Sequence, residues 1–173
     1  MAKGSTIRKN KYNKKVYEQI PVRVKKGEKE GISQCAQRYG MSTNAFILNA
    51  IDAYRISLHR DMIANLKKVI RPIAKKYGAD AVYLFGSRAR GDYRADSDYD
   101  FYVKKGKIRG YFALGGFFEE MKEAVQADID LVSLEEEELD AYLRESIRKD
   151  GILLYEVARP DDCRQGFRVL RRD

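Results

Sequence analysis

The sequence predicts an α+β protein: a mixed central sheet flanked by helices, preceded by a small basic module of one strand and two helices. Two observations support this. Beyond residue 80, short apolar runs typical of buried strands alternate with helical patterns. Before residue 60, one alternating apolar segment is followed by two amphipathic helical segments. A length of 173 residues suffices for one ordinary domain and a small extra module.

Composition excludes several classes of protein. No run of about 18 apolar residues is present, so a membrane span is not expected. No hydrophobic segment follows the basic N-terminus as a secretory signal would require. Cys35 and Cys163 lie far apart, and with His59 as the single histidine they leave no zinc-ligand pattern. These features favour a cytoplasmic protein, with Cys35 expected to be a buried helix residue and His59 a helix-surface residue.

Charge is distributed unevenly along the chain. Residues 1–30 carry ten Lys or Arg against three Glu, whereas residues 119–140 carry ten acids against one Lys. A basic head of this kind favours contact with a polyanion. Residues 1–16 are expected to form a disordered basic arm, and a solvated tail without a partner is the alternative interpretation.

The next segment, residues 17–58, has the pattern of one strand and two helices. Ile20, Val22 and Val24 alternate with polar residues, which predicts a half-buried strand. A helix is expected from about Glu28 to a stop at Gly40, and a second helix follows, capped by Ser42 or Thr43. So small a module cannot bury a core alone, so the strand is expected to pair with its copy in a homodimer.

This order of elements resembles the ribbon-helix-helix family of dimeric DNA-binding proteins, in which a two-stranded ribbon enters the major groove. The resemblance rests on the runs at residues 20–28 and 41–47. It implies contacts with a double-stranded DNA operator, with phosphate bound at the start of the second helix. The residues implied are Gln19, Arg23, Lys25, Ser42, Thr43 and Asn44. Pro21 departs from the family pattern, and ordinary surface charges on a dimerisation strand remain the alternative.

A helical stripe continues from Met62 to Tyr77, and no Gly or Pro occurs between Ser42 and Pro72. The two parts of the chain are therefore expected to be joined by a nearly continuous helix. Pro72 is expected to kink this helix or begin a new segment.

Residues 86–100 carry the strongest chemical signal. An apolar run at residues 81–85 predicts a buried strand that ends in the Gly86-Ser87 turn. A polar connection leads to a second strand with Asp98 and Asp100, whose side chains at i and i+2 point to the same side. Two carboxylates this close repel each other unless a cation lies between them. This pattern predicts a metal site.

A third carboxylate is predicted beside them. A helix is expected at about residues 112–126, and the strand after it, residues 128–132, places Asp130 between apolar neighbours, where a carboxylate is costly unless it is paired or binds a metal. Three carboxylates on two adjacent strands can hold two Mg²⁺ ions roughly 4 Å apart. Asp128 is expected to be a surface acid, and the acidic run at residues 135–138 a solvated helix start.

The turn before these carboxylates suits a phosphate. Gly86 allows close approach of a ligand to the backbone, and the N–H groups beside Ser87 can hold an anion. Arg88 or Arg90 can add positive charge.

The combined motif resembles the minimal nucleotidyltransferases of the DNA polymerase β superfamily. The matching residues are Gly86-Ser87, Gly91, Ser97-Asp98-Tyr99-Asp100 and Asp130. The resemblance assigns residues 59–158 to a nucleotidyltransferase fold, with residues 159–173 as a tail, and it adds Ser97 to the nucleotide site. It implies Mg²⁺-dependent transfer of a nucleoside monophosphate, usually from ATP, to a hydroxyl group. Many minimal members are antitoxins that adenylylate a small helical ribonuclease toxin, which is thus the implied partner.

Two other functions remain open at this point. One is a non-catalytic DNA-binding regulator that retains a nucleotide-binding domain. The other is an enzyme that adds nucleotides to an RNA 3′ end, for which the chain lacks an obvious extra domain to hold the primer.

Overall fold

The computed structural model of the chain describes residues 16–157. The predicted basic arm, apart from Val16, and the predicted tail at residues 159–173 lie outside the described residues. The chain divides into two compact units between Ile51 and Asp52, within the long helix α3 (Thr43–Tyr77). Each unit is described by itself below.

The first unit contains helix α2 (Glu28–Arg38) and the beginning of α3. Ser42 caps α3 as predicted, because its Oγ accepts a hydrogen bond from the backbone N–H of Ala45 at 3.2 Å. The strand predicted at residues 20–24 is absent: residues 17–25 contain no regular secondary structure. A single strand finds no backbone partner within this unit, and unpaired strand groups gain nothing from an extended conformation.

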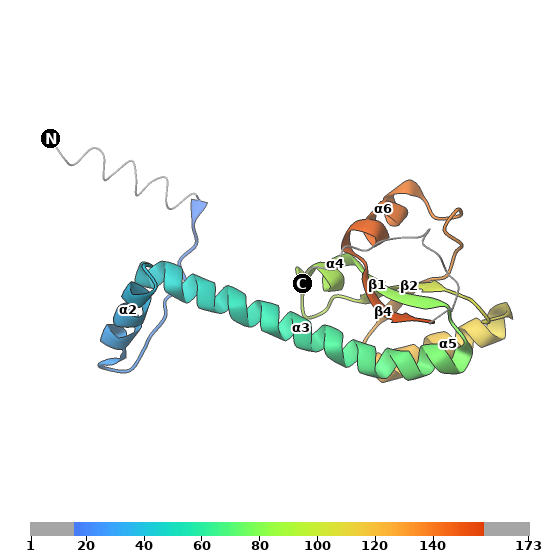
Figure 1. Cartoon of the computed structure of the whole chain (residues 1–173), viewed down its shortest axis with the longest axis horizontal. Coiled ribbons are helices and arrows are strands. Elements are labelled where there is room, and N and C mark those ends of the chain that lie inside the picture. Colours follow the sequence, from blue (N-terminus) through green and yellow to red (C-terminus); the bar gives the residue numbers. More distant parts are fainter. Residues whose placement is uncertain (1–15, 158–173) are drawn as a thin grey trace. The chain divides into compact units, whose positions relative to one another are not determined.

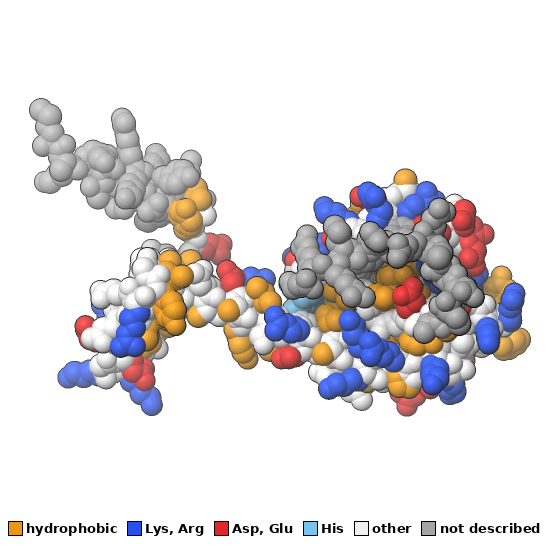
Figure 2. Space-filling model, in the orientation of Figure 1, with side chains coloured by type: hydrophobic (Ala, Val, Ile, Leu, Met, Phe, Trp, Pro, Cys, Tyr) orange, Lys and Arg blue, Asp and Glu red, His pale blue; other side chains and the backbone are white. Residues whose placement is uncertain are grey.

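Apolar side chains of the first unit are largely exposed (Figure 2). Ala36 is the one buried residue among those described in this unit. Ile20 is 86% exposed, Val22 60% and Tyr39 70%. Cys35 is also exposed, so the expectation that it is buried is wrong. The described part of this unit does not form a hydrophobic core of its own.

The second unit (Figure 1) is built on a mixed four-stranded sheet, as predicted. The order of the strands is β3-β2-β1-β4. Strand β1 pairs antiparallel with β2 and with β4, whereas β2 pairs parallel with β3. The strands are β1 (Ala81–Phe85), β2 (Tyr99–Lys104), β3 (Ile129–Val132) and β4 (Ile152–Glu156).

Helices cover both faces of this sheet. On one face, Leu84 and Phe101 pack with Ile70 of α3 and Phe117 of α5 (Gly110–Val125). The predicted helical stripe at residues 62–77 is therefore confirmed. On the opposite face, a second cluster joins strand residues to Ile147 of α6 (Ala141–Asp150).

Helix α3 continues through Pro72 without interruption, so no new segment begins there. Proline removes only one backbone donor, and α3 packs on the sheet through Ile70 and Ile73 on either side of this position. Within residues 16–157, no helix combines the length and the apolar character that a membrane crossing requires.

The acidic run at residues 135–138 was expected to start a helix. It lies instead in the turn before α6. Glu136 lies 3.5 Å from the ammonium of Lys104, and Glu135 lies 3.6 Å from that of Lys105. Helix α6 instead begins after Asp140, whose carboxylate accepts a hydrogen bond from the Leu143 N–H at 2.8 Å.

Gly86 makes the sharp transition from β1 into the short helix α4 (Gly86–Arg90). Its φ of +70° lies in the left-handed region, where L-residues with a side chain are strained. A Cβ at this position would lie 2.9 Å from Cγ of Asp100, inside contact distance. The turn therefore requires glycine for its backbone conformation and for the carboxylate beside it.

Gly86→Ala is expected to destabilise the protein by at least about 1–2 kcal/mol, the cost of the left-handed conformation alone, and to displace Asp100. Gly115→Ala is the matched control, because Gly115 lies within α5 with open space around it, and alanine there should stabilise by about 0.5–1 kcal/mol. Urea denaturation of both variants measures the difference. Equal stability of Gly86→Ala and the wild type would contradict this account of the turn.

Candidate active site

Strand register brings the two central candidates together. Phe85 pairs with Asp100 across β1 and β2, and Asp100 pairs with Asp130 across β2 and β3. Paired residues on adjacent strands project to the same face of a sheet. The Gly86 turn, Asp100 and Asp130 thus form a row across three strands, with Asp98 immediately before β2.

The pKa of Asp100 reflects the carboxylates that lie beside it in this row. Burial raises the pKa of the Asp100 carboxyl, and the negative charges of Asp130 and Asp98 raise that pKa further, while Arg90 counteracts them. Asp130 itself is exposed, because β3 is an edge strand of the sheet. The prediction of a costly carboxylate between apolar neighbours is therefore wrong for Asp130, although its position beside Asp100 agrees with the predicted cluster.

These carboxylates suit a hard divalent cation in kind, since they supply oxygen donors whose mutual repulsion a cation would relieve. Among residues 16–157, however, no three Asp, Glu, His or Cys side chains are grouped closely enough to hold an ion as they stand. The three aspartates interact through their charges without forming a closed set of ligands. Asp98, Asp100 and Asp130 are the residues that would hold Mg²⁺.

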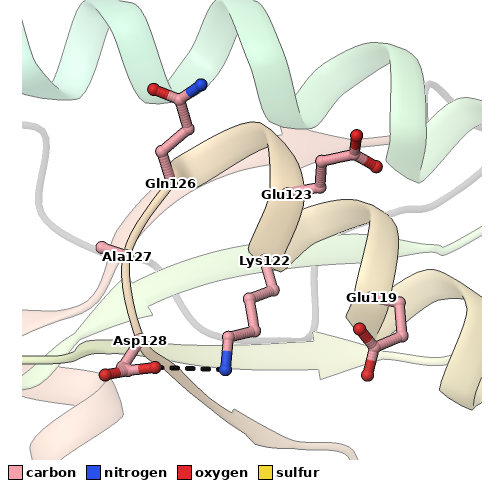
Figure 3. Close-up of a pocket in the computed structure, with 6 residues that line it drawn as sticks. All are labelled: Glu119, Lys122, Glu123, Gln126, Ala127 and Asp128. Carbon is pink, nitrogen blue, oxygen red and sulfur yellow. Dashed lines mark ion pairs between the residues drawn. The ribbon is translucent and has the colours of Figure 1, made fainter.

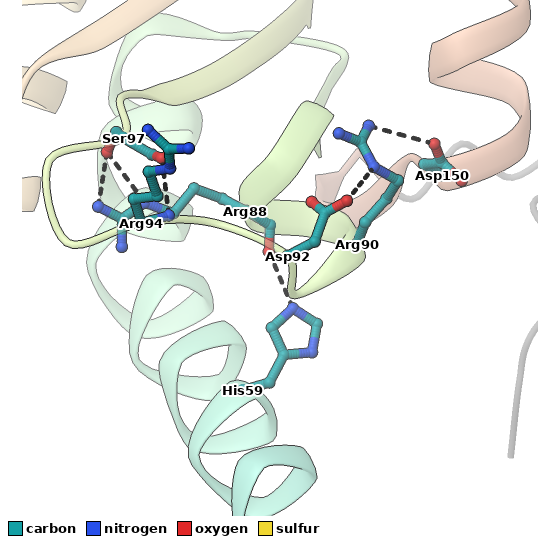
Figure 4. A network of polar contacts seen from close by, with 7 residues as sticks. All are labelled: His59, Arg88, Arg90, Asp92, Arg94, Ser97 and Asp150. Carbon is teal, nitrogen blue, oxygen red and sulfur yellow. Dashed lines mark hydrogen bonds and ion pairs between the residues drawn. The ribbon is translucent and has the colours of Figure 1, made fainter. Parts of the chain in front are cut away.

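Arg90 lies at the end of α4 and remains 40% exposed. Its guanidinium contacts Asp92 at 3.2 Å and Asp150 of α6 at 3.4 Å (Figure 4). The positive charge of Arg90 counteracts the rise in the pKa of the Asp100 carboxyl and so opposes the repulsion within the row.

Arg88 is placed differently from Arg90. It is the one buried charged side chain among residues 16–157, with 8% of its surface exposed. Its Nε and Nη2 donate hydrogen bonds to the carbonyl oxygen of Ser97 at 3.1 and 2.6 Å (Figure 4). The predicted role of Arg88 as a phosphate ligand does not fit this geometry, because its donors already hold a loop.

The remaining nucleotide candidates form backbone turns. The Ser97 hydroxyl accepts a hydrogen bond from the Arg94 N–H at 2.9 Å, which closes the loop before Asp98. The carbonyl oxygen of Ser87 accepts hydrogen bonds from the N–H groups of Gly91 and Asp92, at 2.9 and 3.2 Å. Ser87 and Ser97, which match the family motif, thus also stabilise the turns on either side of the loop before β2.

An open hollow of about 590 Å³ lies apart from this row (Figure 3). It lies around the end of α5, where Lys122 pairs with Asp128 at 3.1 Å. Asp128 is a surface acid, as expected. The hollow holds none of the three aspartates of the row, and its lining residues are Glu119, Lys122, Glu123, Gln126, Ala127 and Asp128.

The candidate DNA contacts in the first unit are only partly arranged as predicted. Gln19, Arg23 and Lys25 are exposed, but no strand forms to align them. The second group lies at the start of α3 as expected, with Thr43 Oγ1 donating to Ser33 Oγ at 3.4 Å. That group consists of Ser42, Thr43 and Asn44.

Three contacts near the row were missed by sequence reasoning. His59, expected on the helix surface, is half-buried with its Nε2 2.9 Å from the carbonyl oxygen of Arg88. Tyr93 stacks on the Arg88 guanidinium, and Asp150 pairs with Arg90. His59 and Asp150 are far from α4 in the sequence, so no local spacing could have indicated these contacts.

Asp100→Asn is expected to raise the melting temperature in EDTA at pH 7, because it removes a half-buried charge repelled by Asp98 and Asp130. The raised pKa means that the folded state binds this proton more tightly than the unfolded chain does. The destabilisation is therefore absent well below the ordinary carboxyl pKa, and it develops as the pH rises through the folded-state value. Scanning calorimetry across acid and neutral pH checks this trend.

Asp96→Asn is the control for that measurement, since Asp96 is exposed in the same loop, and its melting temperature should match the wild type. A lower melting temperature for Asp100→Asn in EDTA would show that repulsion does not dominate at this position.

Comparison with known proteins agrees with this geometry. The family model described as "Polymerase beta, Nucleotidyltransferase" matches residues 67–159, which is more than half of the chain and includes the whole row. No curated protein gives a significant match.

Several solved structures are distantly similar. A minimal nucleotidyltransferase is 28% identical, with 57% of this chain and 93% of that chain covered, at a TM-score of 0.42. A toxin–antitoxin crystal structure with AMP-PNP is 22% identical, with 53% of this chain and 73% of that chain covered, at a TM-score of 0.44. A third structure is of an MNT antitoxin in complex with a tri-AMPylated HEPN toxin from Shewanella oneidensis. It is 21% identical, with 56% of this chain and 73% of that chain covered, at a TM-score of 0.41.

The family match covers the strand, turn and carboxylates that the sheet register brings together. On this basis the chain belongs to the polymerase β nucleotidyltransferase family.

Proposed function

We propose that this protein is a Mg²⁺-dependent nucleotidyltransferase that transfers a nucleoside monophosphate, AMP from ATP, to a hydroxyl group of an acceptor. The observation that carries the proposal is the row of Gly86, Asp100 and Asp130 across three paired strands. In the reaction, the acceptor hydroxyl loses its proton to solvent as its oxygen bonds to the α-phosphorus of ATP, the bond from that phosphorus to the α,β-bridging oxygen breaks, and pyrophosphate leaves.

Each part of the row has a distinct task in this proposal. Asp98, Asp100 and Asp130 hold Mg²⁺, which when bound neutralises phosphate charge and helps to activate the attacking oxygen. Gly86 lets the Asp100 carboxylate lie against the turn that we propose for the phosphates, because a Cβ there would lie 2.9 Å from Cγ of Asp100. Arg90 exchanges part of its pairing with Asp92 and Asp150 for the leaving phosphates.

The acceptor that we propose is a hydroxyl on a small helical toxin protein, for which this chain acts as the antitoxin. Support comes from the resemblance of residues 86–100 to minimal nucleotidyltransferases, many of which act in this way. The competing function is a regulator that binds nucleotide without transferring it.

Incubation of the full chain with α-labelled ATP, Mg²⁺ and the product of a neighbouring toxin-like gene should label that product. The double variant Asp98→Asn/Asp100→Asn should reduce labelling to the level without enzyme, since both removed charges hold Mg²⁺. Asp128→Asn is the matched control, because Asp128 is an exposed acid paired with Lys122, and it should label normally.

Two outcomes of this assay would count against the proposal. Persistent labelling by the double variant would show that the metal ligands are misassigned. Calorimetric binding of ATP and Mg²⁺ without any labelling would favour the non-catalytic regulator.

For the first unit we propose a dimeric ribbon-helix-helix module that binds an operator in double-stranded DNA. The supporting observation is exposure: Ile20, Val22 and Val24 are 86%, 60% and 42% exposed in the single chain. Alternating apolar residues of this kind become buried when two copies pair as a ribbon, at roughly 25 cal/mol per Å² of apolar surface removed from water. The same pairing would align Gln19, Arg23 and Lys25 for the major groove.

Val22→Asp is expected to convert a dimer into a monomer, because it places a charge inside the paired ribbon, and light scattering measures this change. Leu134→Asp is the control; Leu134 is 47% exposed in the second unit, and that variant should remain dimeric. Arg23→Ala should weaken binding to operator DNA and reduce the salt slope by about one unit. A monomeric wild type, or equal affinity for single-stranded RNA, would contradict the ribbon.

A further inference from the structure

We infer that Arg88 is a positioning residue for the carboxylate row: its guanidinium fixes the loop that carries Asp98 into β2. The inference rests on the proposed function, because it concerns the residues that would hold Mg²⁺. Five contacts, described next, tie Arg88 to both ends of this loop and to helix α3.

The first two contacts are the hydrogen bonds from Nε and Nη2 of Arg88 to the Ser97 carbonyl oxygen, at 3.1 and 2.6 Å. Charged donors make stronger hydrogen bonds than neutral ones, and two donors on one acceptor limit its rotation. Ser97 is bonded directly to Asp98. Fixing this carbonyl group therefore restricts the backbone from which the Asp98 side chain projects.

The third and fourth contacts are aromatic. The Arg88 guanidinium carbon lies 4.4 Å from the ring centroid of Tyr93 and 4.2 Å from that of Tyr99. Tyr93 lies near the start of the loop, and Tyr99 is the first residue of β2. The faces of aromatic rings attract a cation most strongly where water is excluded, and Arg88 is the buried charge of the described residues. Stacking therefore stabilises this charge while joining the two ends of the loop.

The fifth contact holds the backbone of Arg88. His59 Nε2 lies 2.9 Å from the Arg88 carbonyl oxygen. A carbonyl oxygen only accepts hydrogen bonds, so Nε2 carries the proton and donates it. His59 belongs to α3, which packs on the sheet through Ile70 and Ile73. Helix α4 and its arginine are thus fixed to the core through a side chain outside the family motif.

These contacts separate the tasks of the two arginines of α4. Arg88 faces Ser97 and two rings, whereas Arg90 is exposed and paired with carboxylates near the row. Arg88 is therefore expected to affect metal affinity through the position of Asp98 and not through contact with a phosphate.

The test compares Arg88→Gln with Arg71→Gln in the full-length protein. Arg71 is the matched control, because it also donates to a backbone carbonyl, that of Leu154 at 3.2 Å, away from the row. Calorimetric titration with Mn²⁺ should show affinity about tenfold lower for Arg88→Gln, the low end for residues that orient metal ligands, and unchanged for Arg71→Gln. Hydrogen exchange of residues 92–98 should become faster in Arg88→Gln alone.

Three further variants keep the test decisive if Arg88→Gln fails to fold. Tyr93→Phe keeps the ring face and should bind Mn²⁺ like the wild type, whereas Tyr93→Leu removes it and should weaken Mn²⁺ binding and loosen the loop. Arg88→Lys keeps the charge with fewer donors and should fall between Arg88→Gln and the wild type.

The outcomes distinguish this inference from the proposed function. Wild-type protein that binds neither Mn²⁺ nor Mg²⁺ would overturn the proposed function and, with it, the positioning role. Wild-type binding together with equal Mn²⁺ affinity in Arg88→Gln would overturn the positioning role alone. Faster exchange in the loop at unchanged affinity would show that Arg88 serves folding only.

Discussion

The pairing of β2 between β1 and β3 is the constraint on which the candidate site depends. It places Asp100 beside the Gly86 turn on one side and beside Asp130 on the other. A shift of β2 by one residue would turn Asp100 toward the core now filled by Phe101 and would move Phe101 to the opposite face of the sheet. The apolar core thus fixes the register, and the register fixes the carboxylates.

This arrangement has an electrostatic cost in the protein without a cation. Asp100 is half-buried and is repelled by two neighbouring carboxylates, and the elevation of its pKa records both effects. Such repulsion is a common property of sites that bind cations, because the ligand set that attracts the ion also destabilises the empty fold. Stability and function therefore oppose each other at this row.

Helix α4 shows how one short segment can serve two purposes. Residues two apart on a helix point in nearly opposite directions, so Arg88 turns into the protein while Arg90 remains at the surface. The first arginine is enclosed by a carbonyl group and two tyrosine rings, and the second is held by two carboxylates. Identical residue types in one motif thus have unlike chemical surroundings.

The sequence by itself determined the local elements and the chemical kind of the site. Residue patterns located β1, β2 and β3, and the residue types from Gly86 to Asp130 indicated a cation and a phosphate. These properties follow from side-chain periodicity and donor chemistry, which are local. The alternation at residues 20–24 was not sufficient in the single chain, where no strand forms, because a strand needs a partner strand.

Tertiary structure alone decided three matters: the exposure of Asp130, the enclosure of Arg88 and the contact of His59 with α4. Asp130 is exposed because β3 lies at the edge of the sheet. The residues of a strand do not indicate its position in the order of the sheet. Arg88 and His59 meet because α3 packs beside the sheet, which depends on contacts between distant residues. Long-range packing of this kind has no signature in the spacing of neighbouring residues.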